Sequence, residues 1–554
     1  MPLFNTLDTS HYYTRVGKHT DLTEKNERRI YRLFEILPGF LSWATLALVF
    51  FLSFAQPVAI ALFIIVFDVY WLTRVIYMTL HFRVAFGHVR KNMRIDWLER
   101  LERLSPTEYS LPGNVHPDAL PGLPAVKSWQ EIFHLIVLPT YKEGAEVIGA
   151  VLNGLAGANY PKSKMIVVLT QEERAGWEFN KEVARLINSK FQNEFFKLLI
   201  VQHPSGITGE LAGKGANIAW AGKYAKKEIV DKMSIPYSHV VVSAFDIDTI
   251  VFPEYFGRLT YVYLTADDPL HASYQPVPFY INNVWEAPSF ARIIAFSSTF
   301  WYMILQERVE AATTFSSHSM PFQALVDVGF WQTNMVSEDS RIFMQCLLYY
   351  NGNYRVEPLF YPVTMDANVA PTFWKTMTNV YKQQRRWAWG VESIPYLLFG
   401  FRKNKIVPKF KKFFLLFTQL EGFWSWATNA LVIFLLGWLP VVFGGNEFNR
   451  TVLSFNLPSL TRTIMTLATV GLITTAIFSI MILPPRPPKY GKFKYIWMLL
   501  QWALFPVTTI ILGSIPALDA QTRLMLGKYM GFWVTPKSPW RGSGATGMPP
   551  MRKY

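Results

Sequence analysis

The sequence predicts an α/β domain, with a mixed, mostly parallel β-sheet and flanking helices, combined with an α-helical transmembrane region. Three observations support this fold class. The chain of 554 residues is 51% hydrophobic and 16% aromatic with a net charge of +15, a combination too apolar for a soluble protein of this size. Several apolar runs are long enough to cross a bilayer. Between them, short runs of β-branched residues alternate with helical stretches, the pattern of a parallel sheet covered by helices.

The first part of the chain predicts a helical hairpin in the membrane. Residues 1–33 are polar and basic, and we expect them on the cytoplasmic side by the positive-inside rule. Residues 34–80 contain two apolar segments separated by a Gln-Pro pair, which predicts two transmembrane helices. A charge is costly in lipid, so Asp68 in the second helix should face another helix or water.

The middle of the chain predicts a linker followed by the α/β domain. Residues 82–104 have apolar side chains at helical spacing among many arginines, which predicts a helix lying on the inner membrane surface within an interfacial region, 81–129. Residues 130–365 contain the β-branched runs and form the expected cytoplasmic domain. These runs are "IFHLIVLPT", "KMIVVLT", "KLLIVQH" and "SHVVVSAFDID". In such sheets, ligands bind where the strands end, so polar residues after each run are candidates for a site.

The remainder of the chain predicts a second membrane region. We expect interfacial helices at 366–411 and a transmembrane region at 412–516 with two clear spans. A third apolar segment in this region is broken at Pro506, and it either crosses the membrane or bends and returns to the same side. Residues 517–554 should form an amphipathic helix, a loop and a flexible tail.

Two carboxylates provide the strongest local signal for a site. Asp246 and Asp248 lie one residue apart in "SAFDIDTIV", directly after an apolar strand. Alternate residues of an extended segment share a face, so the pair can hold a hard divalent ion that keeps positions open for phosphate oxygens. Such a pair also occurs often by chance, so that taken alone it is weak evidence of a metal site.

The first strand ends in "LPTYKEG", where three side chains suit a nucleotide. Thr140 offers a hydroxyl, Tyr141 a ring for stacking a base, and Glu143 an acceptor for base or ribose groups; the alternative is an ordinary turn that opens a helix. Further on, Lys214 lies at a Gly-rich helix start, where its ammonium and free backbone amides can meet a phosphate.

Two more motifs have both a structural and a catalytic interpretation. In "VSEDSRIF", Glu338 and Asp339 begin a helix; acidic residues often stabilise helix N-termini, but one of these carboxylates could also accept a proton from a sugar hydroxyl. In "QQRRWAWG", the mixture of Arg and Trp is typical of a membrane interface and equally of a binding site.

Taken in order, these motifs resemble those of the membrane-bound family 2 glycosyltransferases, which include the cellulose, chitin and hyaluronan synthases. The motifs are "LPTYKEG", "FDIDT", "YQPVPFYINN", "SED", "QQRRW" and "FWVTPK", matching the family's D, DxD, (T/E)ED, QxxRW and FxVTxK signatures. The resemblance implies a GT-A domain and an inverting transfer from a nucleotide-sugar, with UDP as the expected nucleotide. It also favours a processive enzyme.

The resemblance implies a role for each matching residue. Asp246 and Asp248 would hold Mg²⁺ or Mn²⁺ against the diphosphate, and Asp339, accompanied by Glu338, would be the catalytic base. Within QxxRW, Arg386 would pair with the diphosphate, Gln383 would form hydrogen bonds and Trp387 would offer its face to the acceptor sugar. The residues implied as a gating loop over the nucleotide are Phe532, Val534, Thr535 and Lys537. A cytoplasmic gating loop favours the returning path for 493–516.

The sequence departs from the family pattern after the second strand. The family has an acidic pair there that reads the base, whereas this chain has "VLTQEERAG". Gln171, Glu172 or Glu173 must substitute, and we take Glu172 as the candidate.

The predicted function is transfer of a sugar onto a growing β-linked polysaccharide, with translocation across the membrane. The alternative is a single transfer to a membrane lipid, as in ceramide glucosyltransferase, and product length separates the two. A channel or inactive scaffold would have lost acidic motifs, whereas Asp246, Asp248 and Asp339 are all present. A polymer channel should carry aromatic and polar groups on inward helix faces; the candidates are Gln419, Glu421, Trp424, Trp426 and Asn429.

The expected partners are a nucleotide-sugar donor, a glycan acceptor and the lipid bilayer. Nucleic acid is not expected, because Lys and Arg concentrate beside the apolar segments, which favours lipid contact. An accessory export subunit is left open. We expect an integral protein of the cell (inner or plasma) membrane with a cytoplasmic catalytic domain.

Overall fold

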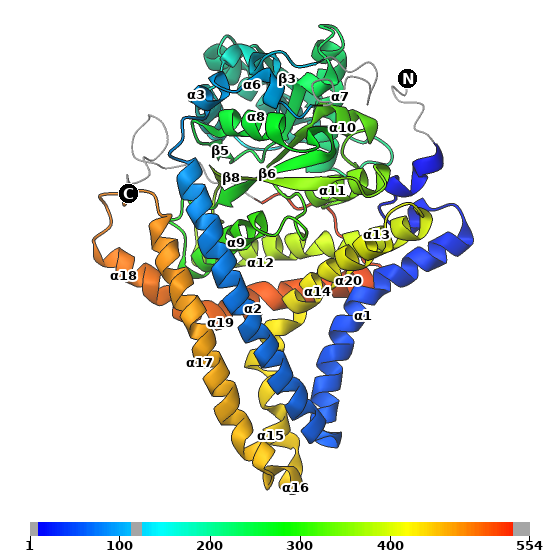
Figure 1. Cartoon of the computed structure of the whole chain (residues 1–554), viewed down its shortest axis with the longest axis vertical. Coiled ribbons are helices and arrows are strands. Elements are labelled where there is room, and N and C mark those ends of the chain that lie inside the picture. The colour runs from blue at the N-terminus through cyan, green and yellow to red at the C-terminus, as the bar shows by residue number, and fades with distance from the viewer. Residues whose placement is uncertain (1–8, 112–124, 536–554) are drawn as a thin grey trace.

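The computed structural model describes residues 9–111 and 125–535. An α/β part lies at one end, and long helices extend from it and converge at the other end (Figure 1). Lys537 lies outside the described residues. The predicted fold class is confirmed: the protein has a mixed sheet with flanking helices, joined to long apolar helices.

The sheet has the strand order β3-β2-β1-β4-β7-β6-β8-β5. The first four strands in this order run parallel, while β7 pairs antiparallel with both β4 and β6. The predicted β-branched runs form β1 to β4. The strands are β1 (Phe133–Thr140), β2 (Met165–Glu172), β3 (Lys197–His203), β4 (Val240–Ala244), β5 (Ile250–Val251), β6 (Ala272–Phe279), β7 (His318–Pro321) and β8 (Arg355–Thr364).

Helices cover both faces of this sheet. Alternate residues of β1 belong to two hydrophobic clusters, Leu135 and Val137 to one and Ile136 and Leu138 to the other, because successive side chains of a strand point to opposite faces. One cluster includes residues of α7 (Lys214–Ala225), α10 (Phe322–Asp327), α11 (Glu338–Tyr349) and α13 (Ser393–Lys403); the other includes α3 (Trp97–Glu102), α5 (Ala145–Ala156), α6 (Trp177–Phe191) and α8 (Tyr255–Thr265).

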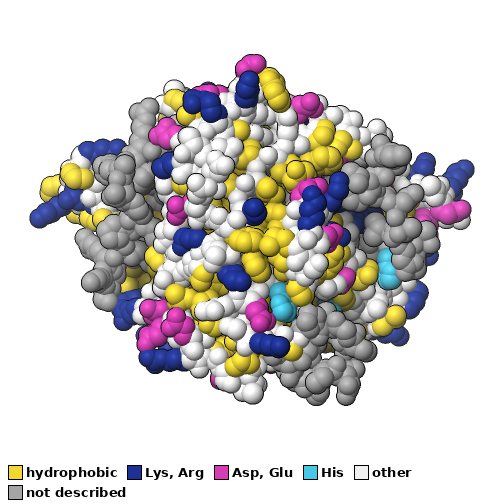
Figure 2. Space-filling view, turned by 90° about the horizontal axis from the view of Figure 1, so that it is seen from above, with side chains coloured by type: hydrophobic (Ala, Val, Ile, Leu, Met, Phe, Trp, Pro, Cys, Tyr) yellow, Lys and Arg dark blue, Asp and Glu magenta, His cyan; other side chains and the backbone are white. Residues whose placement is uncertain are grey.

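The face of the α/β part remote from the long helices carries charges of both signs. Figure 2 shows Lys and Arg interspersed with Asp and Glu around a central group of hydrophobic side chains. The visible, described part of this face therefore presents no continuous surface of one charge.

Two helical hairpins extend away from the sheet. The first joins α1 (Lys25–Ala55) to α2 (Pro57–Asn92), and the second joins α14 (Lys409–Phe434) and α15 (Leu439–Phe443) through α16 (Gly445–Asn449) to α17 (Val452–Met481). Both hairpins turn at the end farthest from the sheet (Figure 1). In the described residues, four helices are long and apolar enough to cross a membrane, or five if the bent pair α14 and α15 counts as one span.

The last apolar segment follows a different path. It consists of α18 (Phe493–Leu500), α19 (Phe505–Thr509), a π-helical turn (Ile510–Ser514) and α20 (Ile515–Met525). Figure 1 shows it running across the molecule below the α/β part, whereas α2 and α17 run lengthwise. Pro506 lies at the start of α19, after a short tighter turn, so the regular helix is interrupted where the sequence predicts a break.

The structure corrects the predicted surface helix at 82–104. Residues 82–92 continue α2, and Phe82, Ala85, Phe86 and Val89 are buried in a cluster with residues of α9 (Ser289–Gln306). Trp97 of α3 is buried against α8. An apolar stripe at helical spacing fits a protein contact as well as a lipid surface, and here a neighbouring helix covers it.

The two helices of the 366–411 region differ in exposure. Trp374 of α12 (Phe373–Ala388) is 77% exposed, whereas most residues of α13 are buried. α13 is thus a core helix under the sheet, which differs from the predicted interfacial position. A helix that is apolar on most sides is stabilised by burial on most sides.

Candidate active site

A cavity of about 700 Å³ lies at the carboxyl ends of β1, β2 and β4 and continues between the long helices. Many of the side chains predicted from separate motifs meet on its wall. They are Thr140, Tyr141, Glu143, Glu172, Lys214, Asp246, Asp339, Gln383, Arg386, Trp387, Phe532, Val534 and Thr535. Asp248 and Glu338 do not line this cavity.

An ammonium group neutralises the first carboxylate of the Asp-x-Asp pair. Lys214 Nζ lies 2.6 Å from Asp246 Oδ1. Burial opposes the charge of Lys214, but the carboxylates of Asp246, Asp339 and Glu338 outweigh this and raise its pKa. Lys214 therefore remains a cation at the end of β4, where a diphosphate would bring further negative charge.

Asp248 lies behind Asp246 and is 4% exposed. Its Oδ2 accepts a hydrogen bond from the Asp366 backbone N–H at 3.1 Å, and the Asn282 amide donates to both the Asp248 carbonyl and Asp366 Oδ1. Asp366 lines the cavity two residues after the end of β8. Sequence reasoning missed Asp366, although a polar residue following a strand is the signal that could have found it.

The carboxylate oxygens at this end of the cavity fit a hard divalent ion only if oxygen atoms of a bound ligand complete its coordination. In the described part of the chain, no group of three or more His, Cys, Asp or Glu side chains is arranged to hold a metal ion. Asp246 and Asp366 nevertheless present carboxylates to the cavity, and carboxylates are preferred by Mg²⁺ and Mn²⁺.

Ser316 connects the Asp-x-Asp carboxylate with the predicted catalytic carboxylate. Its hydroxyl donates to Asp246 Oδ2 and its backbone N–H to Asp339 Oδ2 at 2.8 Å. Ser316 has a positive φ of 45°, which is unfavourable for a residue other than glycine and is often found at functional sites. Sequence reasoning missed this residue, because its backbone conformation has no signature in the sequence.

The structure separates the two acidic residues at the start of α11. Asp339 lines the cavity, whereas Glu338 is buried against α7, where a Cβ atom on Gly215 would lie 3.0 Å from the Glu338 Cβ. Burial, with Asp339 nearby, raises the pKa of Glu338 to about 8. Glu338 is therefore a buried group with a high proton affinity, outside the cavity wall.

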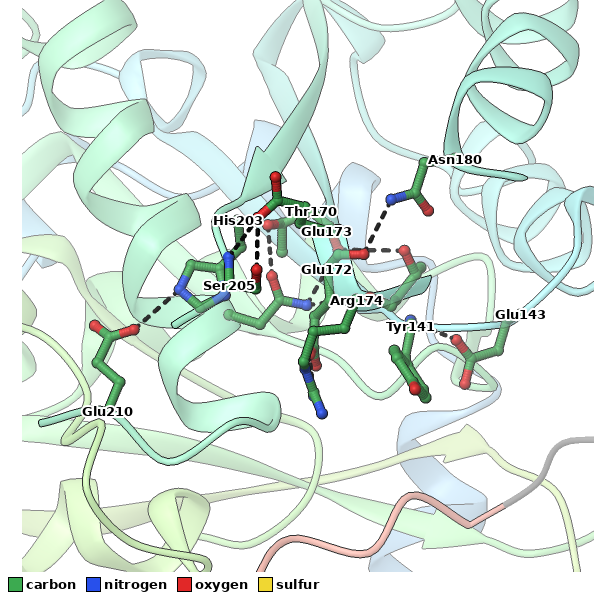
Figure 3. A network of polar contacts seen from close by, with 12 residues as sticks. Tyr141, Glu143, Thr170, Glu172, Glu173, Arg174, Asn180, His203, Ser205 and Glu210 are labelled. Carbon is green, nitrogen blue, oxygen red and sulfur yellow. Dashed lines mark hydrogen bonds and ion pairs between the residues drawn. The ribbon is translucent and has the colours of Figure 1, made fainter. Parts of the chain in front are cut away.

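The end of the cavity beside β1 and β2 combines an aromatic ring with acidic groups. Figure 3 shows Tyr141, Glu143, Glu172 and Arg174 gathered there. Glu143 Oε2 accepts from the Tyr141 N–H at 2.8 Å, and the Arg174 guanidinium donates to Glu172 Oε2 and lies 4.9 Å from the Tyr141 ring centre. Thr140 donates to a backbone carbonyl of β2.

The structure distinguishes the three candidates that follow β2. Glu172 lines the cavity, whereas the Gln171 amide donates to the Asn180 carbonyl. Glu173 accepts two hydrogen bonds from Ser205, one from its N–H and one from its hydroxyl (Figure 3). Of the three, Glu172 is therefore the residue placed to meet a ligand in the cavity.

The QxxRW side chains line the cavity from the last two turns of α12. The Arg386 guanidinium lies 5.1 Å from the Phe532 ring centre, and the Trp387 and Tyr280 ring centres are 6.0 Å apart. Gln383 faces the same cavity. Trp389 is 1% exposed and donates to Glu392, so this stretch faces protein and not a lipid interface.

The chain after α20 enters the cavity. Phe532 packs so closely on Gly213 that a Cβ atom there would lie 2.5 Å from the Phe532 Cγ. Val534 and Thr535 line the cavity beyond it, and Thr535 is 7% exposed. This segment is visible as the pale red ribbon at the lower edge of Figure 3.

Between the helices, the cavity wall is aromatic and polar. Gln419, Glu421, Trp426 and Asn429 of α14 line it as predicted, whereas Trp424 donates to Thr45 of α1 and faces away. On the opposite side, α2 contributes Trp71 and Arg74, and Arg74 pairs with Glu421 at 3.3 Å.

A model of the glycosyl transferase family group 2 matches residues 241–518. A mannosyltransferase from Pyrobaculum calidifontis, solved with GDP-Man and Mn²⁺, is 14% identical; the match covers 73% of this chain and 99% of that one, with a TM-score of 0.39. S. aureus TarS 1–349 with UDP-GlcNAc is 15% identical, with coverages of 62% and 90% and a TM-score of 0.32. No curated protein matches.

The two solved structures are too distant to support an assignment, which therefore rests on the family model. That model spans half of the chain, from β4 to α20, and includes Asp246, Asp339 and the QxxRW residues. The chain therefore belongs to the glycosyl transferase family group 2, and the protein is a glycosyltransferase.

Proposed function

We propose that the protein is a processive, inverting synthase that transfers a sugar from a UDP-sugar to a growing β-linked polysaccharide and passes the polymer across the membrane. The observation that carries this proposal is the continuity of the cavity. One wall extends from Asp246 and Asp339, after the strands, to Trp426 and Asn429 within α14. A sugar chain that is extended beside Asp246 and Asp339 can thus pass into the space between the helices without leaving the protein.

The donor would lie at the charged end of this cavity. Tyr141 and Glu172 would contact the base, Glu143 and Thr140 the ribose, and Lys214 and Arg386 the diphosphate. Asp246 and Asp366, whose carboxylates face the cavity, would hold Mg²⁺ or Mn²⁺ with the phosphate oxygens. Asp248, which does not line the cavity, would support this site by accepting the hydrogen bond from the Asp366 N–H. Such an ion supplies positive charge for the leaving diphosphate. Val534 and Thr535 would close over the nucleotide, with Phe532.

The reaction needs one proton acceptor. An acceptor hydroxyl attacks the anomeric carbon, the bond from this carbon to the diphosphate oxygen breaks, and the proton goes to the Asp339 carboxylate. A single displacement inverts the anomeric configuration. Lys214 and Arg386 stabilise the negative charge that develops on the leaving diphosphate.

The acceptor chain would lie along Trp387 and then among the α14 side chains. Aromatic rings present flat apolar faces, and the amides of Gln383 and Asn429 offer hydrogen bonds. A neutral chain can slide along such a surface because no single contact is strong.

We place the α/β domain in the cytoplasm of a cell that carries the protein in its inner or plasma membrane. Residues 9–33 and the basic stretch before α14 lie on the same side as this domain, and basic segments favour that side. In this arrangement the segment 493–525 lies near the inner surface and returns, so that the following residues reach the donor.

The first test is product size. The full-length protein in lipid nanodiscs is incubated with labelled UDP-sugars and Mn²⁺ or Mg²⁺, beside the Asp339→Asn variant. Long polymer from the wild type and none from the variant are expected. No transfer from any UDP-sugar contradicts the UDP assignment.

One observation favours transfer to a lipid as the second candidate. The cavity wall includes Trp301, which is 40% exposed, and Phe417, which is 58% exposed. Side chains that border both the cavity and the outer surface of the helices could admit a lipid acceptor from the side. Recovery of a single sugar on extracted lipid, in place of polymer, would establish this alternative.

A further inference from the structure

The chain that enters the cavity after α20 is bound by a buried carboxylate, which lies outside the cavity. Glu35 of α1 is 1% exposed. The Tyr529 hydroxyl donates to its carboxylate, with oxygen distances of 2.9 and 2.8 Å. Tyr529 lies three positions before Phe532 in the sequence.

The N-terminal residues complete this contact. The His19 backbone N–H donates to Glu35 Oε1 at 3.1 Å, and His19 Nδ1 lies 2.6 Å from the Tyr529 hydroxyl and 3.0 Å from Glu35 Oε2. Arg32 pairs with Glu35 at 2.9 Å. The buried charge is therefore balanced and its lone pairs are used, as a buried carboxylate requires.

The same region also fixes the end of α20. Arg32 donates to the backbone carbonyls of Leu524 and Met525. The chain then turns at Gly527, whose φ of 70° suits glycine. Arg32 and Glu35, one turn apart on α1, thus hold both sides of this turn.

A short path leads from Tyr529 to the donor end of the cavity. Phe532 packs on Gly213, the residue before Lys214, and lies under the Arg386 guanidinium. Beyond it, Thr535 lines the cavity.

We propose that Glu35 and Tyr529 form a clamp that positions residues 532–535 over the bound nucleotide. This inference rests on the proposed function. Both are positioning residues, because they act through the segment and do not line the cavity. Anchoring the base of the segment reduces the conformational freedom that is lost when it closes over the donor, and so favours donor binding.

Burial and the Glu35 carboxylate raise the pKa of Tyr529. The hydroxyl therefore stays protonated at neutral pH and can donate, whereas phenylalanine at this position keeps the ring and loses the donor. Tyr529→Phe is accordingly the sharpest variant.

The test uses the full-length protein in nanodiscs, with UDP and Mn²⁺ as the probe. For Tyr529→Phe we expect the Kd for UDP to rise by about 10- to 100-fold, the value of one hydrogen bond to a charged group. The KM for the UDP-sugar that the wild type uses should rise by the same factor, with kcat at saturating donor unchanged. Loss of folded protein would instead lower the apparent kcat and leave KM unchanged.

The matched control is Tyr12→Phe. The Tyr12 hydroxyl also donates to a glutamate of α1, Glu27, at 2.8 Å, but Tyr12 does not precede the cavity segment. This variant should bind UDP like the wild type. Hydrogen–deuterium exchange without nucleotide gives a second measurement: amides 527–535 should exchange faster in Tyr529→Phe and unchanged in Tyr12→Phe.

Each outcome decides a different point. Equal exchange in Tyr529→Phe and wild type contradicts the clamp. Faster exchange with unchanged Kd and KM also contradicts it, because Tyr529 would then have no role in donor binding. If the wild type binds neither UDP nor another nucleoside diphosphate, the proposed function fails, and the exchange measurement still decides whether the clamp exists.

Discussion

The two ends of the cavity are lined by different kinds of side chain. At the strand ends, Lys214, Asp246 and Asp339 are charged and lie close together, and most of their polar atoms are already paired. Between the helices, the wall consists of aromatic rings and neutral amides, with Arg74 and Glu421 as a compensated pair. For the proposed function, an anionic donor needs charged groups that hold it in one position, whereas a neutral polysaccharide chain that moves needs many weak contacts. The difference predicts that mutations at the two ends will impair different steps.

The largest effect is expected for Asp339→Asn. The amide keeps the shape of the carboxylate and cannot accept the proton, so sugar transfer should fall by roughly 10²- to 10⁴-fold. UDP binding should change little. Transfer and UDP affinity are measured on the same preparation, with the surface variant Asp231→Asn as control. Near-normal transfer would show that another group takes the proton.

Lys214→Ala should impair donor binding. It removes the cation beside Asp246, so the Kd for UDP should rise by about 10- to 100-fold. Calorimetry at several salt concentrations measures this loss, and Lys223→Ala on the same helix is the control. Equal losses in the two variants would mean that general charge, and not the position of Lys214, governs binding.

Trp426→Leu should shorten the product without slowing the first transfer. Losing one aromatic contact weakens the hold on the chain by about three- to tenfold. Product length is compared by gel filtration, with Trp424→Leu as the matched control, because Trp424 faces α1 and not the cavity. A shorter product from the control alone would reverse the assignment of the two faces.

The smallest effect concerns stability at the charged end. Burial raises the pKa of Glu338 to about 8, above its value in the unfolded chain, so the folded state binds the proton more tightly. Stability should therefore fall as the pH rises from about 4.5 to 8 and stay level above that. Glu338→Gln should remove this part of the pH dependence, measured as Tm against pH. An identical pH profile in the variant would show that other groups cause the dependence.

Several parts of this arrangement follow from the sequence. The β-branched runs predicted β1 to β4 because a strand buried on both faces must be apolar throughout. The same reasoning placed Asp246 beyond a strand end, because a carboxylate there has no stabilising role in a core. The order of motifs then identified side chains, from Tyr141 to Phe532, that meet in one cavity.

Other parts had no signature in the sequence. The apolar stripe at 82–104 fits lipid and protein equally well, and the packing of α2 on α9 decided between them. Composition and spacing did not distinguish Glu338 from Asp339, and only the resemblance implied Asp339 as the base. The rotation of α11 determined that Asp339, and not Glu338, reaches the cavity. Ser316 was not predicted, because a positive φ at a residue other than glycine is imposed by the surrounding structure and has no sequence pattern.

The sequence by itself determined which segments are apolar, where strands end and which reactive side chains follow them, because these depend on composition and local periodicity. The tertiary structure alone decided what lies across from each side chain. Contacts between distant positions, such as Glu35 with Tyr529 and Phe532 with Gly213, depend on how helices and sheet pack in three dimensions. Local periodicity carries no information about these contacts.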